Sequence, residues 1–161
     1  MSNPPPLLRI ATSPHETHLL ATFAQDSSVI RILDVRQPGQ ALLELRGHGG
    51  ALNCVDWSPT RRGTLASGAD DCQVLVWDLL SSSSSGGSSS ANGGLGLAAG
   101  AGAGGVGDQG GGASGNARGP VASWQCDHEV GNVGWVPHLS SPEYGEWLGV
   151  SAGRGVWGVR L

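Results

Sequence analysis

The sequence predicts an all-β protein built from short strands, and three observations support this fold class. Apolar runs of strand length alternate with clusters of turn-forming residues, such as Gln25-Asp26-Ser27-Ser28. No segment of about ten or more residues has a convincing helical period. The pattern also repeats along the chain. Leu20-Ala21-Thr22 returns as Leu65-Ala66-Ser67, and Val55-x-Trp57-x-Pro59 returns as Val133-x-Trp135-x-Pro137.

The offsets between these copies set the size of the repeated unit. The first offset is 45 residues, and the second is 78, or 39 once the 39 residues of block 81–119 are left out. Both offsets are close to the ~40–45 residues of one four-stranded propeller blade. We therefore expect three units with strands at, in order, residues 19–23, 29–35 and 41–45; 52–57, 65–67, 74–79 and 121–126; and 132–136, 147–151 and 156–161.

The second unit carries the most specific motif. Gly47-His48 precedes Trp77-Asp78 with room for three strands between the two dipeptides. This unit resembles a WD40 repeat, in which such GH and WD dipeptides bracket each unit. The resemblance implies a WD40 β-propeller, of which the chain would supply about three blades of an incomplete, seven-bladed ring. It also implies a structural tetrad of buried, hydrogen-bonded side chains, and the matching residues are His48, Ser67, Asp71 and Trp77.

A Ser, a His and an Asp in one unit also raise the alternative of a hydrolase. A nucleophilic serine needs an exposed, strained turn and an oxyanion hole. Ser67 instead lies inside a predicted strand, and no G-x-S-x-G surrounds it. A buried histidine between an acid and a hydroxyl satisfies a polar network equally well. We therefore expect no catalytic residues and no enzyme activity.

The outer two units are degenerate copies of the second. In the first unit Leu33-Asp34 replaces the WD dipeptide, while Thr22 and Asp26 stand where Ser67 and Asp71 stand in the second. The last unit has no WD dipeptide, and Arg154 falls near the position of the turn aspartate. We expect packing of three tryptophans to hold that unit, namely Trp135, Trp147 and Trp157.

Composition divides the chain into four parts. We expect a degenerate blade at 1–46, a well-formed blade at 47–80 with 120–126, and a last degenerate blade without its outer strand at 127–161. Block 81–119, rich in Gly, Ser and Ala, has too few apolar side chains to form a core, so the sequence predicts a disordered insertion there. A propeller closes with about four to eight blades. The sequence therefore predicts a piece of a longer protein, or a chain that a partner completes.

The other motifs predict no nucleic-acid, cofactor or metal site. The net charge is −4 without a basic run, which argues against direct nucleic-acid binding and against an anionic membrane surface. Gly100-x-Gly102-x-x-Gly105 lies in a Gly/Ala repeat and predicts no nucleotide cofactor. His15 and His18 lack further ligands, so no metal is expected. Three cysteines without a CxxC motif suggest buried, reduced thiols.

The ordered parts most resemble one WD40 subfamily, the Transparent Testa Glabra / Anthocyanin-eleven group, which includes DDB-one- and Cullin-four-associated factor seven. The matching segments are Pro6-Leu7-Leu8-Arg9-Ile10, Ile32-Leu33-Asp34-Val35-Arg36, Ala69-Asp70-Asp71-x-Gln73 and Val159-Arg160-Leu161. The resemblance implies a scaffold in the cytoplasm and nucleus that assembles kinases or transcription regulators. The alternative is a substrate receptor of a Cullin-four-type ubiquitin ligase. Asp34 and Arg36, a partial WDxR element, would then contact the ligase adaptor, although an ordinary solvated charge explains Arg36 as well.

Overall fold

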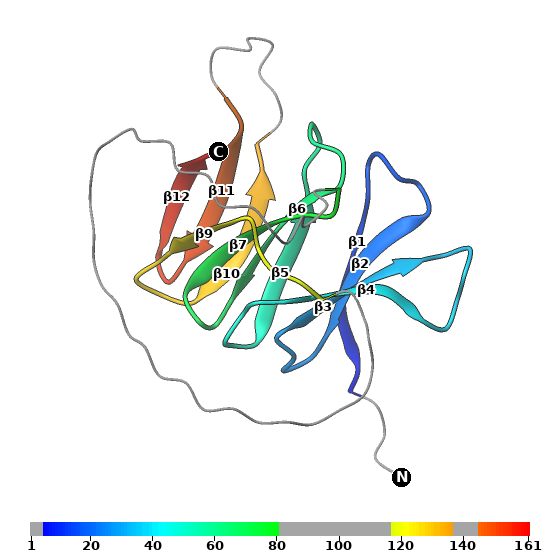
Figure 1. Cartoon of the computed structure of the whole chain (residues 1–161). Coiled ribbons are helices and arrows are strands. Elements are labelled where there is room, and N and C mark those ends of the chain that lie inside the picture. Colours follow the sequence, from blue (N-terminus) through cyan, green and yellow to red (C-terminus); the bar gives the residue numbers. More distant parts are fainter. Residues whose placement is uncertain (1–4, 81–116, 137–144) are drawn as a thin grey trace, which may run out of the picture. The chain divides into compact units, whose positions relative to one another are not determined.

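The structure, a computed structural model, describes residues 5–80, 117–136 and 145–161. Within these ranges the chain forms β-strands and no helix (Figure 1). The described part of the chain thus has no helix that could cross a lipid bilayer. Predicted segments that fall in residues 81–116 and 137–144 lie outside the described residues. The strands form three separate sheets, which are called the first, middle and third sheet in chain order.

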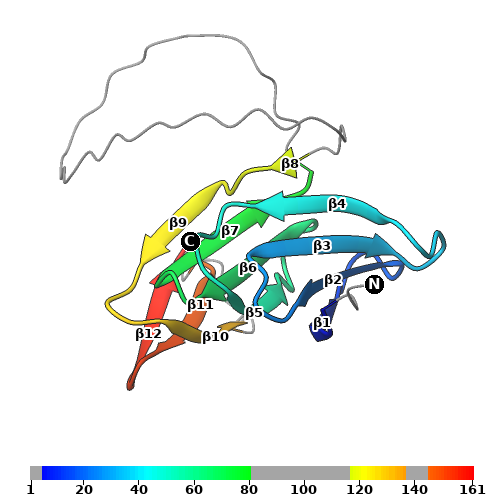
Figure 2. The ribbon, with the colours of Figure 1, turned by 90° about the horizontal axis from the view of Figure 1, so that it is seen from below.

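The first sheet has the strand order β1-β2-β3-β4-β8. Four antiparallel strands follow one another in the chain, and β8 then adds to β4 in parallel, with Glu44 opposite Ala117 (Figure 2). Short loops join the first four strands, as expected for antiparallel neighbours. Their bounds are β1 Leu7–Thr12, β2 Leu19–Ala24, β3 Val29–Asp34, β4 Ala41–Arg46 and β8 Ala117–Arg118.

The middle sheet has the order β5-β6-β7-β9, and the third sheet has the order β10-β11-β12. Every neighbouring pair in both sheets is antiparallel. The middle sheet comprises β5 Leu52–Trp57, β6 Thr64–Ala69, β7 Gln73–Asp78 and β9 Ala122–Gln125. The third comprises β10 Val130–Trp135, β11 Trp147–Ala152 and β12 Gly155–Arg160. All three sheets thus have the up-and-down order of a propeller blade.

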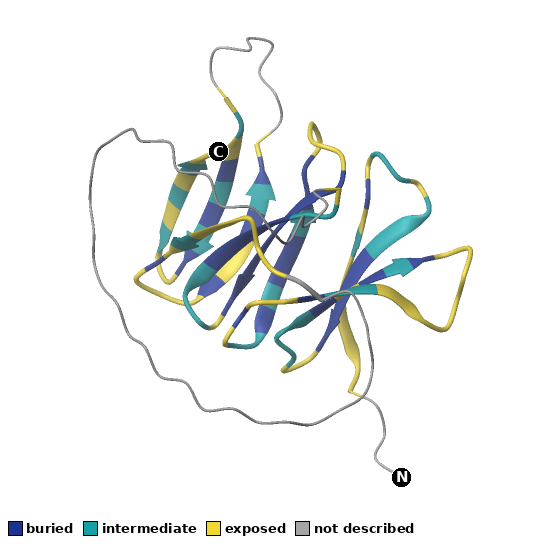
Figure 3. Cartoon of the chain, viewed as in Figure 1, coloured by how far each residue is buried: buried dark blue, intermediate teal, exposed yellow. Residues whose placement is uncertain are grey.

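Two apolar clusters join the sheets face to face. One cluster joins the first sheet, through Phe23, Ile30 and Ile32, to one face of the middle sheet, through Leu65 and Trp77. The other joins the opposite face of the middle sheet to the third sheet and contains Cys54, Val74, Val130, Leu148 and Val150 among its members. Because the middle sheet is covered on both faces, every residue of β6 is buried (Figure 3).

Gly68 shows how tightly the middle and third sheets pack. A Cβ atom at this position would lie 2.3 Å from Cγ1 of Val130, which is closer than two carbon atoms can approach. The absence of a side chain on β6 therefore lets the first residue of β10 reach the backbone of the middle sheet. Any larger residue at position 68 would push the third sheet away.

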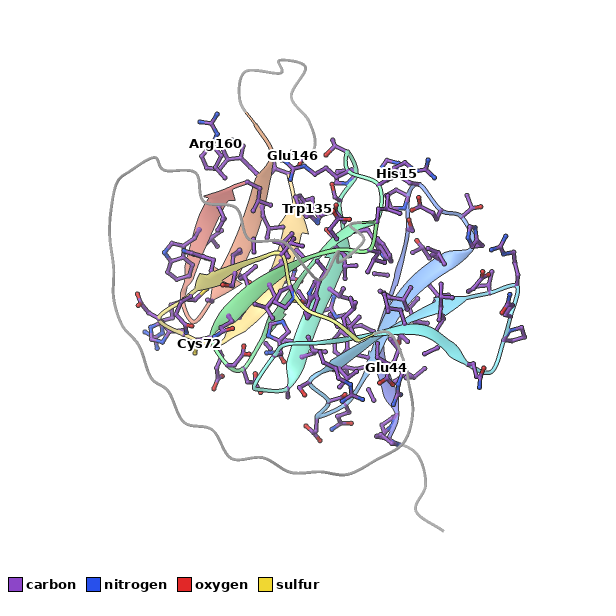
Figure 4. The ribbon with its side chains drawn as sticks, in the orientation of Figure 1. His15, Glu44, Cys72, Trp135, Glu146 and Arg160 are labelled. Atoms are coloured by element: carbon purple, nitrogen blue, oxygen red, sulfur yellow. The ribbon has the colours of Figure 1, made fainter. Side chains whose placement is uncertain are left out.

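The strands run between two ends of the sheets. The histidine end carries His48, the β6–β7 turn and the β9–β10 loop, and the tryptophan end carries Trp57 and Trp135, the last residues of β5 and β10. Figure 4 places Cys72 at the histidine end, and Trp135 and Glu146 at the opposite end. The two ends carry different side chains and are therefore described separately below.

The structure differs from the sequence predictions in three places. Strand β1 was not among the predicted strands, because its residues do not alternate between polar and apolar, and most of them are exposed. Ala117–Arg118, which the sequence analysis placed at the end of the insertion, pairs with β4. Trp147 is 40% exposed, so Trp135, Trp157 and aliphatic residues pack the third sheet onto the middle one instead.

Candidate interaction surface

The four residues of the expected tetrad lie in one hydrogen-bonded chain inside the middle sheet. The indole Nε1 of Trp77 donates to Ser67 Oγ at 2.8 Å. Ser67 Oγ lies 2.8 Å from His48 Nε2, and His48 Nδ1 lies 3.0 Å from a carboxylate oxygen of Asp71. The chain links β7, β6, the loop before β5 and the β6–β7 turn. It therefore fastens the histidine end of this sheet.

The partners assign the protons. Ser67 accepts from the indole and donates its own proton to His48 Nε2, so the imidazole carries its proton on Nδ1 and donates it to Asp71. Burial lowers the pKa of His48, and the neighbouring carboxylate only partly opposes this shift. Burial alone would raise the pKa of Asp71, but the N–H of Gly49, the His48 ring and the N–H of Gln73 outweigh it and hold that pKa below its usual value. The pair is a neutral imidazole beside a carboxylate.

Only a small residue fits at position 47, directly before His48. A Cβ atom at this position would lie 3.0 Å from Cη2 of Trp77 and 3.1 Å from Cδ of Pro120. The GH and WD dipeptides are therefore in direct van der Waals proximity, although they are far apart in the sequence. The backbone at Gly47 thus approaches the indole ring closely, and the next residue, His48, reaches Ser67.

The order Ser67–His48–Asp71 is also the order of a hydrolytic triad, and burial separates the two interpretations. Ser67 is 0% exposed, and its oxygen already accepts the proton of Trp77. A nucleophilic serine must be reached by the substrate carbonyl, with oxyanion-stabilising donors about 3 Å away. A hydroxyl that is enclosed on all sides in the middle sheet does not meet this requirement.

The first sheet does not reproduce the tetrad at its matching residues. Thr22, in the place of Ser67, is buried and donates to the carbonyl of Arg9 at 2.6 Å. Asp26, in the place of Asp71, is exposed and has a φ of 58°, a left-handed conformation that aspartate tolerates. The hydroxyl of Thr22 therefore links β2 to β1 and does not bond a histidine as Ser67 does.

At the tryptophan end, a repeated hydrogen bond links each sheet to the one before it. The indole Nε1 of Trp57 donates to the carbonyl of Ala11 in β1 at 3.0 Å, and that of Trp135 donates to the carbonyl of Asp56 in β5 at 3.2 Å. Trp135 also donates its backbone N–H to the carboxylate of Asp56 at 3.1 Å. The sequence analysis found the repeated V-x-W-x-P segment but did not predict this function. Two tryptophans at equal positions were the signal that could have shown it.

Two neighbouring arginines of the β5–β6 loop reinforce this end. Arg62 Nε donates to Glu16 in the β1–β2 loop of the first sheet at 3.0 Å, and Arg61 Nε lies 2.5 Å from Glu146, directly before β11 of the third sheet. Both arginines are more than half exposed. Such pairs contribute about 0–1 kcal/mol each, so they align the sheets more than they stabilise them.

The histidine end has a hollow between two of the sheets. It is an open pocket of about 790 Å³ between the middle and third sheets. Carboxylates dominate its charge, with Asp70 on the β6–β7 turn and Asp127 and Glu129 on the β9–β10 loop. The remaining lining residues are Asn53, Cys72, His128, Gly131, Ser151 and Gly153. Asn53 spans the two sheets, because its Nδ2 donates to Asp70 at 2.6 Å and to the carbonyl of Val130 at 3.0 Å.

The sequence analysis did not predict this pocket. Asp70 was noted only as a turn residue, while Asp127 and Glu129 were not singled out. The pocket arises where loops of two sheets meet, and such proximity leaves no spacing pattern in the sequence. Arg154 follows pocket residue Gly153 and is exposed, so it is the cation closest in sequence to the pocket lining.

Asp34 and Arg36 lie at the tryptophan end of the first sheet and are held together. Arg36 donates from Nε at 2.9 Å and from Nη2 at 2.6 Å to the carboxylate of Asp34, which also accepts the backbone N–H of Arg36. These hydrogen bonds lower the pKa of Asp34 to about 2. Asp34 is buried while the arginine side chain is 64% exposed. The guanidinium therefore has a fixed orientation at the surface.

The remaining candidate residues come together in no site. Within the described ranges, no three His, Cys, Asp or Glu side chains are arranged to hold a metal ion. Cys54 and Cys126 are buried free thiols, while Cys72 is partly exposed.

Blades of antiparallel strands stacked face to face, one of them with a Trp–Ser–His–Asp hydrogen-bonded chain, place the fold in the class of β-propellers. Residues 39–78, which contain the tetrad, match the family described as WD domain, G-beta repeat (WD40). Residues 39–78 are therefore a WD40 repeat. The match also covers the strands that carry the tetrad, and the all-β sheets agree with the predicted fold class.

Relatives extend this likeness along the whole chain. The chain is 36% identical over 177 residues to a WD repeat-containing protein of Saccharomyces cerevisiae, an alignment that covers 96% of the chain and 33% of the relative. It is 40% identical over 76 residues to the DDB1- and CUL4-associated factor 7 homolog of Dictyostelium discoideum, covering 47% of the chain and 23% of the relative. The chain thus spans about a third of the length of the first relatives that it matches.

Among solved structures, the chain resembles one in a crystal structure of the mitotic checkpoint complex. The TM-score is 0.54 at 20% identity, with 90% of this chain and 32% of the other chain covered. At this level of identity, the likeness concerns the fold alone.

Proposed function

We propose that the chain is a non-catalytic scaffold that holds partner proteins at the histidine end of its blades. WD40 repeats mediate protein–protein contacts, and this role accounts for the described residues without an active site. The open pocket between the middle and third sheets is the observation that carries the proposal. Loops held by rigid sheets are where binding residues concentrate in many folds.

The charge of the pocket indicates the chemistry of the partner. Three lining carboxylates are matched by no lining arginine, so a cationic segment of a partner complements the pocket best. The resemblance to the Transparent Testa Glabra / Anthocyanin-eleven group supports kinases or transcription regulators as the partner proteins. It also supports a location in the cytoplasm and nucleus, and neither direct nucleic-acid contact nor membrane binding is part of the proposal.

A binding assay with charge-matched peptides tests this proposal. We expect the chain to bind a fluorescent arginine-containing peptide and not its glutamate counterpart, with affinity that falls as salt rises. The double variant Asp127→Asn with Glu129→Gln should weaken binding about tenfold, equivalent to about 1.4 kcal/mol. Asp26→Asn is the matched control, since Asp26 is an exposed acid at the same end of another sheet. Equal binding of both peptides, or equal loss in the control variant, would contradict the proposal.

An activity-based probe tests the non-catalytic part of the proposal. A fluorophosphonate reacts with activated serine nucleophiles, so the folded chain should not be labelled at Ser67. Labelling that disappears in Ser67→Ala would favour a hydrolase instead.

A second candidate is a substrate receptor of a Cullin-four-type ubiquitin ligase. The name of the Dictyostelium relative and the fixed, exposed guanidinium of Arg36 favour it. A pull-down with the purified ligase adaptor tests it. We expect Arg36→Ala to abolish binding, while Arg31→Ala, which removes an exposed arginine from the same sheet, should retain it. Absence of binding by the unmodified chain would exclude this candidate.

A further inference from the structure

Cys72 and Cys126 lie opposite each other at the histidine end of the middle sheet. In the β7–β9 pair, Gln73 faces Gln125 and Val74 faces Trp124. One step further along the same antiparallel register, Cys72 faces Cys126. The backbone confirms this step, because the N–H of Cys126 donates to the carbonyl of Cys72 at 2.7 Å.

The two side chains belong to the same face of the sheet. Cys72 has a φ of 62° and precedes β7, so its face follows from its surroundings: it lines the pocket between the middle and third sheets. Val74 and Cys126 both belong to the cluster that packs against the third sheet, and Trp124 packs against it. Directly opposite residues of an antiparallel pair have Cα atoms about 4.5–5.5 Å apart, which is within the ~4.4–6.8 Å range of disulfides.

We propose that Cys72 and Cys126 form a reversible disulfide that fastens the β9–β10 loop to the β6–β7 turn under oxidising conditions. Cys72 is the accessible partner, since it lines the open pocket, whereas Cys126 is only 7% exposed. The Cys72 thiolate attacks a low-molecular-weight disulfide such as oxidised glutathione, and one glutathione thiol leaves. The Cys126 thiolate then attacks the sulfur of Cys72 and releases the second glutathione. Two protein thiols are oxidised, and one glutathione disulfide is reduced to two thiols.

The third cysteine is excluded by its strand. Cys54 lies on β5, two strands from β7 and three from β9. At about 4.8 Å per strand, it is roughly 10–14 Å from either partner, beyond the ~7 Å limit for a disulfide without backbone movement. Burial raises the pKa of Cys54 to about 11 and also raises that of Cys126, so the position on the strand, not the pKa, excludes Cys54.

The disulfide would act on the candidate interaction surface. The loop that begins at Cys126 carries Asp127 and Glu129, and the turn that ends at Cys72 carries Asp70, so both walls of the pocket become joined covalently. The bond also closes the segment between residues 72 and 126, which includes block 81–119. We therefore expect the oxidised chain to hold the three pocket carboxylates in one arrangement.

Peptide mapping decides the proposal. Trypsin places each cysteine in its own peptide, 47–61, 63–118 and 119–154. The native chain, treated with oxidised glutathione, should yield peptide 63–118 linked to 119–154, and one alkylatable thiol in place of three. Amides of residues 127–129 should exchange more slowly with deuterium. A reductant should reverse both changes.

Variants and a denaturant control make the outcome specific. Cys72→Ser and Cys126→Ser should each abolish the linked peptide, while Cys54→Ala should retain it. In urea the same oxidant should give all cysteine pairings, so the native map alone remains decisive where Cys126→Ser does not fold. Glutathione retained on Cys72, a link to Cys54, no reaction, or the same mixture with and without urea would each overturn the proposal.

Discussion

The imidazole of His48 has partners at both ring nitrogens, so its proton position is set by Ser67 and Asp71. Each donor and acceptor in this chain has a partner, and a buried polar network stabilises only when this condition holds. The chain also connects elements that come from four places in the sequence. Removing one member therefore leaves the others buried without a partner.

The first prediction concerns the acceptor at the end of this chain. Asp71 accepts from His48 Nδ1 and from the backbone N–H groups of Gly49 and Gln73. Asp71→Ala removes all three acceptor contacts, and we expect it to lower the free energy of unfolding by roughly 1–3 kcal/mol. Urea unfolding at low protein concentration, where the chain is monomeric, measures this change.

Asp70→Ala is the control for that prediction. Asp70 is the adjacent carboxylate in the same turn, but it is exposed, and its carboxylate accepts from the side chain of Asn53. We expect a loss of less than about 1 kcal/mol for this surface contact. Equal losses in the two variants would show that the buried chain has no special role.

The second prediction concerns pH. Burial lowers the pKa of His48 below its ordinary value of 6.5, so the unfolded chain binds a proton at this residue more readily than the folded chain. The stabilisation by neutral His48 is therefore fully present above about pH 6.5 and is lost as pH falls toward the folded-state pKa. We expect the Tm difference between the unmodified chain and His48→Gln to shrink from about pH 7.5 to about pH 5. A difference that is constant or grows on acidification would contradict the lowered pKa.

At the residue scale, the sequence predicted the tetrad and missed the contacts between sheets. His48, Ser67, Asp71 and Trp77 stand at fixed offsets within one unit, so a repeat pattern reveals them. The partners of Asp56 and of the paired arginines lie in neighbouring sheets. The number of residues that separates two partners along the sequence differs from one contact to the next. Long-range contacts of this kind are set by how sheets stack, which no local spacing records.

Elements in this protein derive much of their order from neighbouring elements. Strand β6 was predicted only at residues 65–67, yet it spans Thr64–Ala69, because pairing with β5 and β7 on both sides includes its glycine. Strand β1 was not predicted, because its exposed residues have no strand periodicity of their own. It is held by pairing with β2 and by the indole of Trp57, which donates to Ala11. Sequence patterns therefore identify the covered strands better than the edge strands.

The third prediction tests the indole contacts at this scale. Trp57→Phe keeps an aromatic ring but removes the donor to the partly buried carbonyl of Ala11 and leaves a smaller side chain in the core. We expect a loss of about 1–3 kcal/mol in the free energy of unfolding and faster hydrogen exchange in β1. Trp135→Phe should give a comparable loss, with faster exchange in β10 and β11 instead. Faster exchange in the same strands for both variants would show that these contacts do not act between particular sheets.

For the whole molecule, the middle sheet differs from the other two because it alone is covered on both faces within the described residues. The first and third sheets each place one face against the middle sheet. Each of them also has apolar side chains that are exposed to solvent. Leu8 and Ile10 in β1 are 52% and 65% exposed, and Val156 in β12 is 81% exposed. Strands β1 and β12 are also sheet edges with unpaired backbone groups. Exposed apolar patches and unpaired edges both favour association between chains.

The fourth prediction follows from these surfaces. We expect the 161-residue chain to self-associate in proportion to its concentration, which sedimentation velocity measures directly. Replacing Ile10 and Val156 by serine should reduce the associated fraction, because each substitution adds a hydroxyl to one of the exposed surfaces. Val35→Ser is the matched control, since Val35 is 55% exposed but lies in the loop after β3 rather than within a strand. A chain that stays monomeric at all concentrations, or a control that reduces association equally, would show that the uncovered sheets are stable in water by themselves.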